Sequence, residues 1–527
     1  MIFRASICFL AAFALALGCE DDDKHFGSSD DDDGSADGDS DGDGDTDSDS
    51  DSDSDTDTEY TGPAIPETCA QAEQATTTVG CLFYAVDLDS HDNVETQQYA
   101  VAVSNVNQTQ TAHVTIYKGN AGSGGWDIHS EADVGPMSLH QFNLEDYHMN
   151  ASGVMPKGSY KVESDVPIIA YQFNPVDGAS SYLSDASMLI PVPSLSQTYD
   201  VIGWKQSCQS QCDGDMRAYF TVVAVEDGTQ LTINPSVAPL PGGVVPGSAT
   251  PFYVDLDEGD VLEVETNAPY DSLSGTRIES NDDHPIIVFS GQECAFIPFE
   301  VYACDHLEEQ LPGMRFWGKE FVAARMPVRS SATQSEMVLW QIYASEDDTA
   351  VSISASSGVM NIPFTEATLE QGQLVEFAVN GSQAQPGDFF VQADKPIAVM
   401  QYMIGSENEN CGSIGDPAMV YTSPTEQFLN RYVVLVPGTW INDALVVTRH
   451  AGVQVDIDGV AVPDSSFVDV AGSGYEVARI PIDDGIHTLE SADESKGLAV
   501  IVVGYDQWDS YAYAGGMGMG EINPVVE

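Results

Sequence analysis

The sequence predicts an all-β protein: four tandem β-sandwich-like repeats of about 100–120 residues behind a disordered acidic linker. Three observations carry this prediction. β-branched and aromatic residues alternate with polar ones between Gly, Asn and Asp turns, no long stretch has a helical period, and strand motifs recur at matching intervals. A closed ring or propeller-like arrangement of the units is the alternative, since tandem β-rich units also pack radially.

The first recurring motif is a polar break followed by a short apolar run. It appears at Pro167, Pro285, Pro396 and, more weakly, Gly497, in steps of 118, 111 and 101 residues. Because each run is short, apolar and rich in β-branched residues, each is expected to form a buried strand.

A second motif keeps the same step and reads as strand, turn, strand. Residues Val223–Ile233 correspond to Tyr343–Ile353 and loosely to Val447–Ile457, and Asp227-Gly228 suits a tight hairpin. Extended prolyl segments close the units. The predicted repeats are therefore residues 67–205, 206–326, 327–437 and 438–527, with at most one helical turn, from Asp305 to Leu311.

The N-terminus predicts export and lipidation. Arg4 precedes an apolar run from Ile7 to Leu17, and small residues lead to Cys19, so residues 1–18 are typical of a cleaved lipoprotein signal peptide. The run is too short to span a bilayer. We expect Cys19 to carry acyl chains that anchor the protein at the bacterial cell surface, in the outer membrane. A soluble secreted protein is the alternative.

Residues 19–66 are predicted to be the lipidated cysteine and a disordered Asp/Ser-rich linker. From Glu20 to Glu59 the chain has twenty acidic residues and one basic residue, and it lacks the apolar side chains of a core. Asp39, Asp41, Asp43 and Gly44 match the opening of an EF-hand loop, but Ser50 stands where that loop needs Glu. We expect only weak, non-specific calcium binding there and no other cofactor.

Strong acidity excludes nucleic acid as a partner. Residues 60–527 alone contain 64 acidic and 15 basic residues, and such a chain repels a phosphate backbone.

The cysteines predict disulfides, because an exported chain matures in an oxidising compartment. Proximity in sequence suggests three short loops and leaves Cys411 over. The candidate pairs are Cys69 with Cys81, Cys208 with Cys212, and Cys294 with Cys304. A zinc site at Cys208 and Cys212 is disfavoured, since no second ligand pair has finger-like spacing.

The residues that resemble catalytic or metal-binding groups favour other interpretations. Cys304 beside Asp305 and His306 suggests a thiol nucleophile, but Cys304 is expected to be oxidised with Cys294. A polar cluster at Asp87, Asp89, His91 and Asp92 offers oxygen ligands but lacks the Gly and Glu of a calcium loop, so we expect a solvated turn. No nucleophile elbow, P-loop or His-Glu-x-x-His motif occurs in the sequence.

Several segments together resemble the IgGFc-binding protein family, over roughly residues 79 to 518. They are Val79–Asp89, Cys304–Pro312 (Cys-Asp-His-Leu-Glu-Glu-Gln-Leu-Pro) with Trp317–Phe321, Gly415–Met419, Ser423–Phe428 and Ser510–Gly516. The family's domain occurs in an animal mucus glycoprotein and in bacterial surface lipoproteins. The resemblance implies a binding role; an immunoglobulin ligand is implied by the name alone, without a residue signature.

These observations predict a non-enzymatic surface lipoprotein that presents a β-array for adhesion or for binding an extracellular protein or glycan. Its lipid anchor implies a membrane partner. A self-associating surface coat component is the alternative, and a hydrolase with an unrecognised site is a lesser one.

Overall fold

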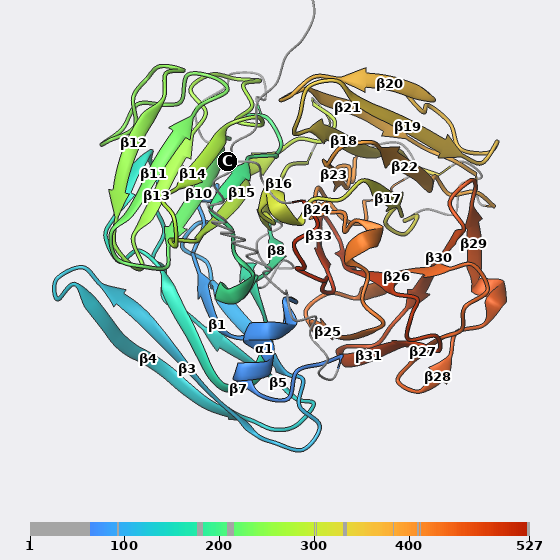
Figure 1. Cartoon of the computed structure of the whole chain (residues 1–527), viewed down its shortest axis with the longest axis horizontal. Helices are drawn as coiled ribbons and strands as arrows, with labels where there is room; N and C mark the ends of the chain where they lie inside the picture. The colour runs from blue at the N-terminus through green and yellow to red at the C-terminus, as the bar shows by residue number, and fades with distance from the viewer. Residues whose placement is uncertain are drawn as a thin grey trace, which may run out of the picture. The chain divides into compact units, whose positions relative to one another are not determined.

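The computed structural model describes residues 64–91, 94–176, 183–207, 216–299, 301, 303–329, 335–382, 384–407, 411 and 413–523. Residues Tyr60–Glu527 form one compact unit, and the description below concerns that unit. It consists of separate antiparallel sheets with little helix, so the all-β prediction is confirmed (Figure 1).

The first repeat is a single bent sheet of seven strands. Its long central strand β7 pairs mainly with β3 and β1 along its N-terminal part and with β2 and β8 along its C-terminal part, so the sheet turns along this strand. The strands are β1 (Gly80–Ala85), β2 (Ala100–Asn105), β3 (Ala112–Asn120), β4 (Gly125–Val134), β5 (Leu139–Asn143), β7 (Tyr160–Asn174) and β8 (Asp185–Met188).

The second repeat is a sandwich of two sheets around one apolar core. Its inner sheet contains β6 (Gly153–Met155), β10 (Ala218–Ala224), β13 (Val261–Glu265), β15 (Ile286–Ala295) and β16 (Asp305–Gln310). Its outer sheet contains β9 (Thr198–Asp200), β11 (Thr229–Asn234), β12 (Phe252–Leu256) and β14 (Arg277–Ser280). β10 is buried throughout, whereas β11 alternates between buried and more exposed residues, because only one face of the outer sheet is covered.

The third and fourth repeats are sandwiches too. The third pairs a sheet of β17 (Glu320–Ala323), β19 (Thr349–Ala355), β20 (Glu366–Leu369) and β22 (Phe389–Ala393) with one of β18 (Val338–Ala344), β21 (Leu374–Val379), β23 (Ile397–Tyr402) and β24 (Met419–Tyr421). The fourth pairs β25 (Arg431–Val436), β27 (Val455–Ile457), β28 (Val460–Ala461) and β31 (Gly485–Ser491) with β26 (Asn442–His450), β29 (Phe467–Val470), β30 (Tyr475–Pro481), β32 (Leu498–Asp506) and β33 (Asp509–Ala514).

Four strands close the repeats into a cycle. β8, β16, β24 and β33 each pair with the long strand that precedes them, and they also contact one another in the order β8, β16, β24, β33 and back to β8 (Figure 1). The two ends of the unit meet as well, because the Met519 amide donates to the Thr76 carbonyl at 2.6 Å and Thr77 bridges to Gly518. Sandwich-like repeats and a closed arrangement are therefore both present.

Strand β16 corrects one expectation. Asp305 to Leu311 was predicted to form at most a helical turn, and Asp305–Gln310 is instead a strand buried on both faces. Its polar residues are typical of a solvent-exposed turn. In the folded protein, however, neighbouring strands and their backbone donors surround these side chains.

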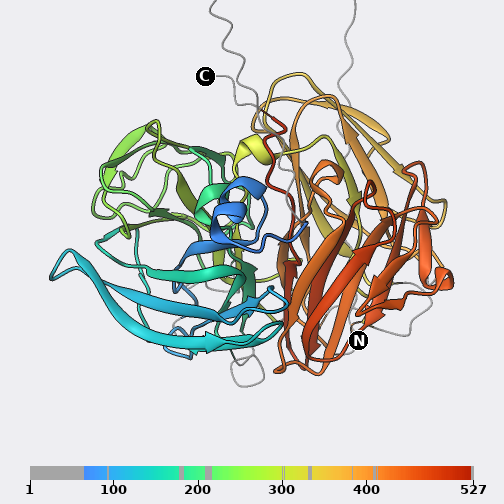
Figure 2. The same cartoon turned by 60° about the horizontal axis from the view of Figure 1, so that its bottom comes forward.

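Among the described residues, helical structure consists of one short helix and four 3₁₀ turns. These are α1 (Cys69–Ala75), η1 (Val192–Ser194), η2 (Met314–Phe316), η3 (Thr425–Gln427) and η4 (Asp464–Ser466). A capping box between Thr68 and Gln71 starts α1, which the Cys69–Cys81 disulfide ties to β1. Figure 2 shows α1, in blue, next to η1.

Candidate functional site

The segment Asp305–Gln310, part of the most specific sequence motif, lies at the centre of the cycle. All six residues of β16 are at most 3% exposed. The pKa of His306 is lowered to about 3 by burial, so its ring is neutral. Cys304 forms the predicted disulfide with Cys294, and its sulfur is therefore not the thiol that a nucleophile requires.

Four buried aspartates hold the central strands together. Asp185 accepts hydrogen bonds from the backbone amides of Glu308 at 3.3 Å and Met419 at 3.2 Å, so one carboxylate connects β8, β16 and β24. Asp305 accepts from the Ser184 amide at 2.6 Å. These bonds satisfy backbone donors at the ends of short strands, which explains acidic residues in a buried place.

The other two central carboxylates belong to the last two repeats. Asp509 accepts from the Ser184 hydroxyl at 2.8 Å and from the Trp440 indole at 2.6 Å, and Asp416 accepts from the Ser406 amide at 3.1 Å. Burial raises the pKa of Asp509 well above the usual range of an aspartate and raises the pKa of Asp416 to about 7. The motif thus contributes to architecture rather than to an accessible site.

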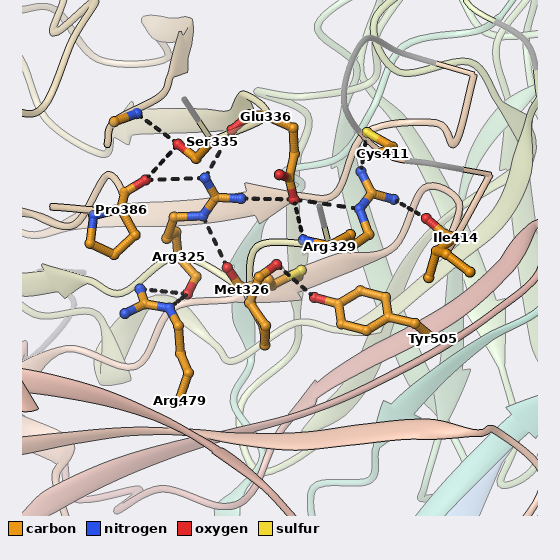
Figure 3. Close-up of polar contacts among 12 residues, drawn as sticks. Arg325, Met326, Arg329, Ser335, Glu336, Pro386, Cys411, Ile414, Arg479 and Tyr505 are labelled. Atoms are coloured by element: carbon orange, nitrogen blue, oxygen red, sulfur yellow. Dashed lines mark hydrogen bonds and ion pairs between the residues drawn. The ribbon is translucent and has the colours of Figure 1, made fainter. Parts of the chain in front are cut away.

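A second polar network joins the third and fourth repeats (Figure 3). The Arg325 guanidinium donates to the carbonyls of Met326, Glu336 and Pro386 at 2.8 to 3.1 Å and to the Glu336 carboxylate at 3.2 Å. Arg479 of β30 donates to the Arg325 carbonyl at 2.9 Å. Buried charged side chains thus connect the third repeat to the fourth.

Cys411, the cysteine left over by the pairing, lies in the same network. It is buried and free, and Arg329 donates to its sulfur at 3.1 Å (Figure 3). Burial raises the pKa of this thiol, which disfavours a reactive thiolate.

The accessible site is a groove of about 1110 Å³ over the outer sheet of the second repeat. It lies over β11, β12 and β14, whose inward residues fill the core while the alternate residues point outward. The groove is lined by Ser196, Gln197, Thr198, Gln230, Leu231, Thr232, Tyr253, Asp255, Glu279, Ser280, Asn281, Asp282, Asp283, Arg315 and Glu521.

Strand register aligns the side chains of this groove in a row. Tyr253 of β12 lies opposite Thr232 of β11, which lies opposite Glu279 of β14, which lies opposite Thr198 of β9. Tyr253 is 75% exposed and is therefore available to a partner. The lining contains five acidic side chains and one basic one, Arg315, so the groove is acidic.

The corresponding face of the third repeat has a smaller groove of about 520 Å³. It is lined by Ala350, Val351, Ser352, Glu366, Ala367, Thr368, Gln392, Ala393 and Asp394. Without an aromatic side chain, it is the weaker candidate.

The outcome for the predicted residues is mixed. The disulfides Cys69–Cys81 and Cys294–Cys304 are confirmed, whereas Cys19, Cys208 and Cys212 lie outside the described residues, as does the linker's EF-hand-like segment. The groove was missed, although the alternation in Phe252–Leu256 contained its signal.

The expected solvated turn at Asp87 and Asp89 is wrong. Both side chains are buried, at 3% and 4% exposure, because the extended chain after β1 runs beneath neighbouring segments, and the Tyr147 amide donates to Asp87 at 2.8 Å. His91 is half-buried, and Asp92 lies outside the described residues.

In the part of the chain that the structure describes, no helix is long and apolar enough to cross a membrane.

Comparisons with known proteins give one informative match. A family described as "IgGFc binding protein" matches residues 185–504. No curated protein matches. Among solved structures, an anti-sigma factor domain-containing protein from Clostridium clariflavum is 7% identical, with 80% of this chain and 97% of that chain covered and a TM-score of 0.12. Salmonella alpha-2-macroglobulin reacted with methylamine is 10% identical, with 84% and 33% covered and a TM-score of 0.12. Neither structural likeness carries an argument about this chain.

Proposed function

The chain belongs to the IgGFc-binding protein family, which is a family of binding domains rather than of enzymes, and we propose that it binds an extracellular protein through the acidic groove of its second repeat. The observation that supports this most is the row of outward side chains that ends at Tyr253. The Tyr253 side chain is largely exposed to solvent. Exposed tyrosines are frequent anchors of protein interfaces, because they offer large contact area at a small entropic cost.

Charge specifies the kind of partner. Asp255, Glu279, Asp282, Asp283 and Glu521 lie around the groove. An acidic surface steers and retains a basic one, so the partner is a protein whose contact face carries Lys or Arg. Neutral glycans gain nothing from this charge.

The binding test uses the full chain on an array of purified extracellular proteins and glycans that includes immunoglobulin constant-region fragments. At least one basic protein should bind saturably, and Tyr253→Ser should weaken that binding roughly 10- to 100-fold, because an exposed aromatic anchor is lost. Tyr270→Ser is the matched control, since Tyr270 is 53% exposed and lies outside the groove lining. A blank array, or equal binding by both variants, would contradict the proposal. Assembly that increases with concentration in light scattering would favour the coat component instead.

We also propose that Cys19 anchors the chain in a membrane. The apolar run followed by small residues and Cys19 supports this. Cys19→Ser should move the protein from the membrane fraction to the soluble fraction, because each buried acyl CH₂ contributes about 0.8 kcal/mol. The control is Cys411→Ser, which keeps the signal; unchanged fractionation of Cys19→Ser would contradict the anchor.

A further inference from the structure

Three carboxylates gather inside the unit, between the first repeat and the inner sheet of the second. Asp89 lies on the extended chain after β1, and Glu263 and Glu265 lie on β13. Oxygens of all three lie within 4.8 Å of one another, and the residues are 4%, 1% and 2% exposed. Such a concentration of buried acid requires a physical explanation.

The strands determine why these side chains meet. Glu263 and Glu265 are two positions apart, so they share one face of β13. Their partners in register on β10 are Thr221 and Tyr219, whose side chains lie on the same face. The Tyr219 hydroxyl donates to the Asp89 carbonyl at 2.7 Å and holds the Asp89 segment over this face.

Several oxygens in this space have no hydrogen-bond partner. Among the described residues, Glu263 Oε1 and Glu265 Oε1 are buried without one. The Thr221 hydroxyl, which is not part of the acidic group, is also buried without a partner, and it faces Glu263 across the pair of strands. A neutral hydroxyl oxygen on the same face of the sheet thus joins the two carboxylate oxygens that are buried without a partner.

One carboxylate of the cluster has a cationic neighbour, because Arg217 Nε lies 3.2 Å from Glu265 Oε2. The negative charge of Glu293 also disfavours the ionised form of Glu263 and so raises the pKa of Glu263. Buried carboxylates in excess of cations are costly unless a proton or a metal ion compensates them.

We propose that a divalent cation of the calcium type binds between Asp89, Glu263 and Glu265, with the Thr221 hydroxyl as a further oxygen ligand. Oxygens that surround one Ca²⁺ at 2.3–2.6 Å are at most about 5 Å apart, which agrees with the observed spread. The donor set contains oxygen alone, whereas Zn²⁺ favours nitrogen and sulfur and Mg²⁺ retains waters that a buried site has to accommodate.

The second acidic group, Asp87 with Asp146 and His148, does not support the same inference. Its His148 ring already pairs with Asp146 at 2.6 Å, and Asp146 and His148 are not buried. The bound ion of the proposal would instead connect the Asp89 segment of the first repeat to β13 of the second, and it would stabilise that contact.

The test measures the thermal midpoint of the full chain at pH 7.5 in excess EGTA and in 2 mM CaCl₂. Calcium should raise the midpoint by roughly 5 °C, because a ligand of the folded state stabilises by mass action. Glu263→Gln should abolish this shift, since the amide keeps the size of the side chain and removes a charged ligand. Glu226→Gln, at an exposed carboxylate, is the matched control and should keep the shift.

Calcium bound by the acidic linker does not confuse this readout. The linker is the same in every variant, so any calcium that it binds contributes equally to all of them. Thr221→Val is a second variant that retains all carboxylates, and it should need several-fold more calcium for half the shift. Tyrosine-sensitised Tb³⁺ emission gives an independent readout, since Tyr219 lies beside Glu265, and this emission should fall in Glu263→Gln.

Two results would overturn the proposal. One is the same calcium shift in Glu263→Gln as in the unmodified chain. The other is no calcium shift in the unmodified chain together with a higher midpoint of Glu263→Gln in EGTA, which would indicate that protons alone compensate these carboxylates.

Discussion

Raising the pH from 4.5 to 8 is expected to lower the urea midpoint of the full chain substantially, and Asp416→Asn is expected to remove part of that dependence. Burial raises the pKa of Asp87, Asp416 and Asp443 from 3.8 to about 7. The folded state therefore holds protons that the unfolded state releases above pH about 4. Because these folded pKa values are raised, their contribution to stability is complete below pH about 4 and is lost as the pH rises through about 7.

The magnitude for Asp416 is a few kcal/mol. A shift of about three pKa units corresponds to at most about 4 kcal/mol, since one unit is 1.36 kcal/mol. Exposed carboxylates have a weaker effect of opposite sign. Partial burial raises the pKa of Asp458, but hydrogen bonds from His487 and other donors outweigh it and lower this pKa overall. The contribution of Asp458 to stability is therefore lost only as the pH falls below 4. The window from 4.5 to 8 contains the titration of the buried acids. It also contains an opposite contribution from His306, whose lowered pKa destabilises the folded state below pH about 6.5, so the difference between the unmodified chain and Asp416→Asn reports Asp416.

The measurement is the urea midpoint at six pH values for the unmodified chain, Asp416→Asn and Asp469→Asn. The amide at position 416 costs the same free energy at every pH, so the slope is the readout. Asp469 is exposed, and its variant should follow the unmodified slope. Parallel curves for the unmodified chain and Asp416→Asn would contradict the prediction.

Arg325→Ala is expected to destabilise the unit by about 3–5 kcal/mol. Removing one partner of a buried ion pair leaves the other charge with less compensation. The Arg325 side chain is 2% exposed and donates to three carbonyls as well as to the Glu336 carboxylate (Figure 3). Arg329 alone would then face Glu336, at 3.6 Å.

The test compares urea denaturation of Arg325→Ala, Arg325→Met and the exposed control Lys496→Ala at pH 7. Met fills part of the volume without donating hydrogen bonds, so the difference between the two arginine variants separates lost packing from lost charge and donors. Lys496→Ala should change the free energy of unfolding by less than about 0.5 kcal/mol. An Arg325→Ala variant as stable as this control would show that the network contributes nothing.

The repeats were predictable because they are a local property of the chain. A short apolar run after Pro285 or Pro396 forms a buried strand wherever the repeat lies, and Asp227-Gly228 makes a hairpin from neighbours in sequence. The disulfides Cys69–Cys81 and Cys294–Cys304 close short loops, and they were predictable for the same reason.

Which strand completes which sheet was not predictable. β9, β17 and β25 each lie at the end of one predicted repeat and pair with β14, β22 and β31 of the next. Whether a strand joins the sheet of the following repeat depends on how the repeats pack against one another. Pairing between segments that are distant in the chain has no signal in a local sequence window.

The candidate site shows the same limit. The pattern Phe252–Leu256 predicts a half-buried strand with Tyr253 outward, but only the register across three strands places Tyr253, Thr232 and Glu279 in one groove. Asp89 appeared to be part of a solvated turn, and it became a candidate ligand only when β13 was found to carry Glu263 and Glu265 beneath it.

The sequence by itself determined the β class, the repeat and the family resemblance, because strand periodicity, turn residues and motifs are encoded within a few neighbouring positions. It also predicts the export signal and the acidic linker. Tertiary structure alone decided that the polar motif Asp305–Gln310 is a central buried strand and that carboxylates from different repeats meet. The physical reason is that burial of a charge depends on what packs over it, and here the covering segments are far away in the chain.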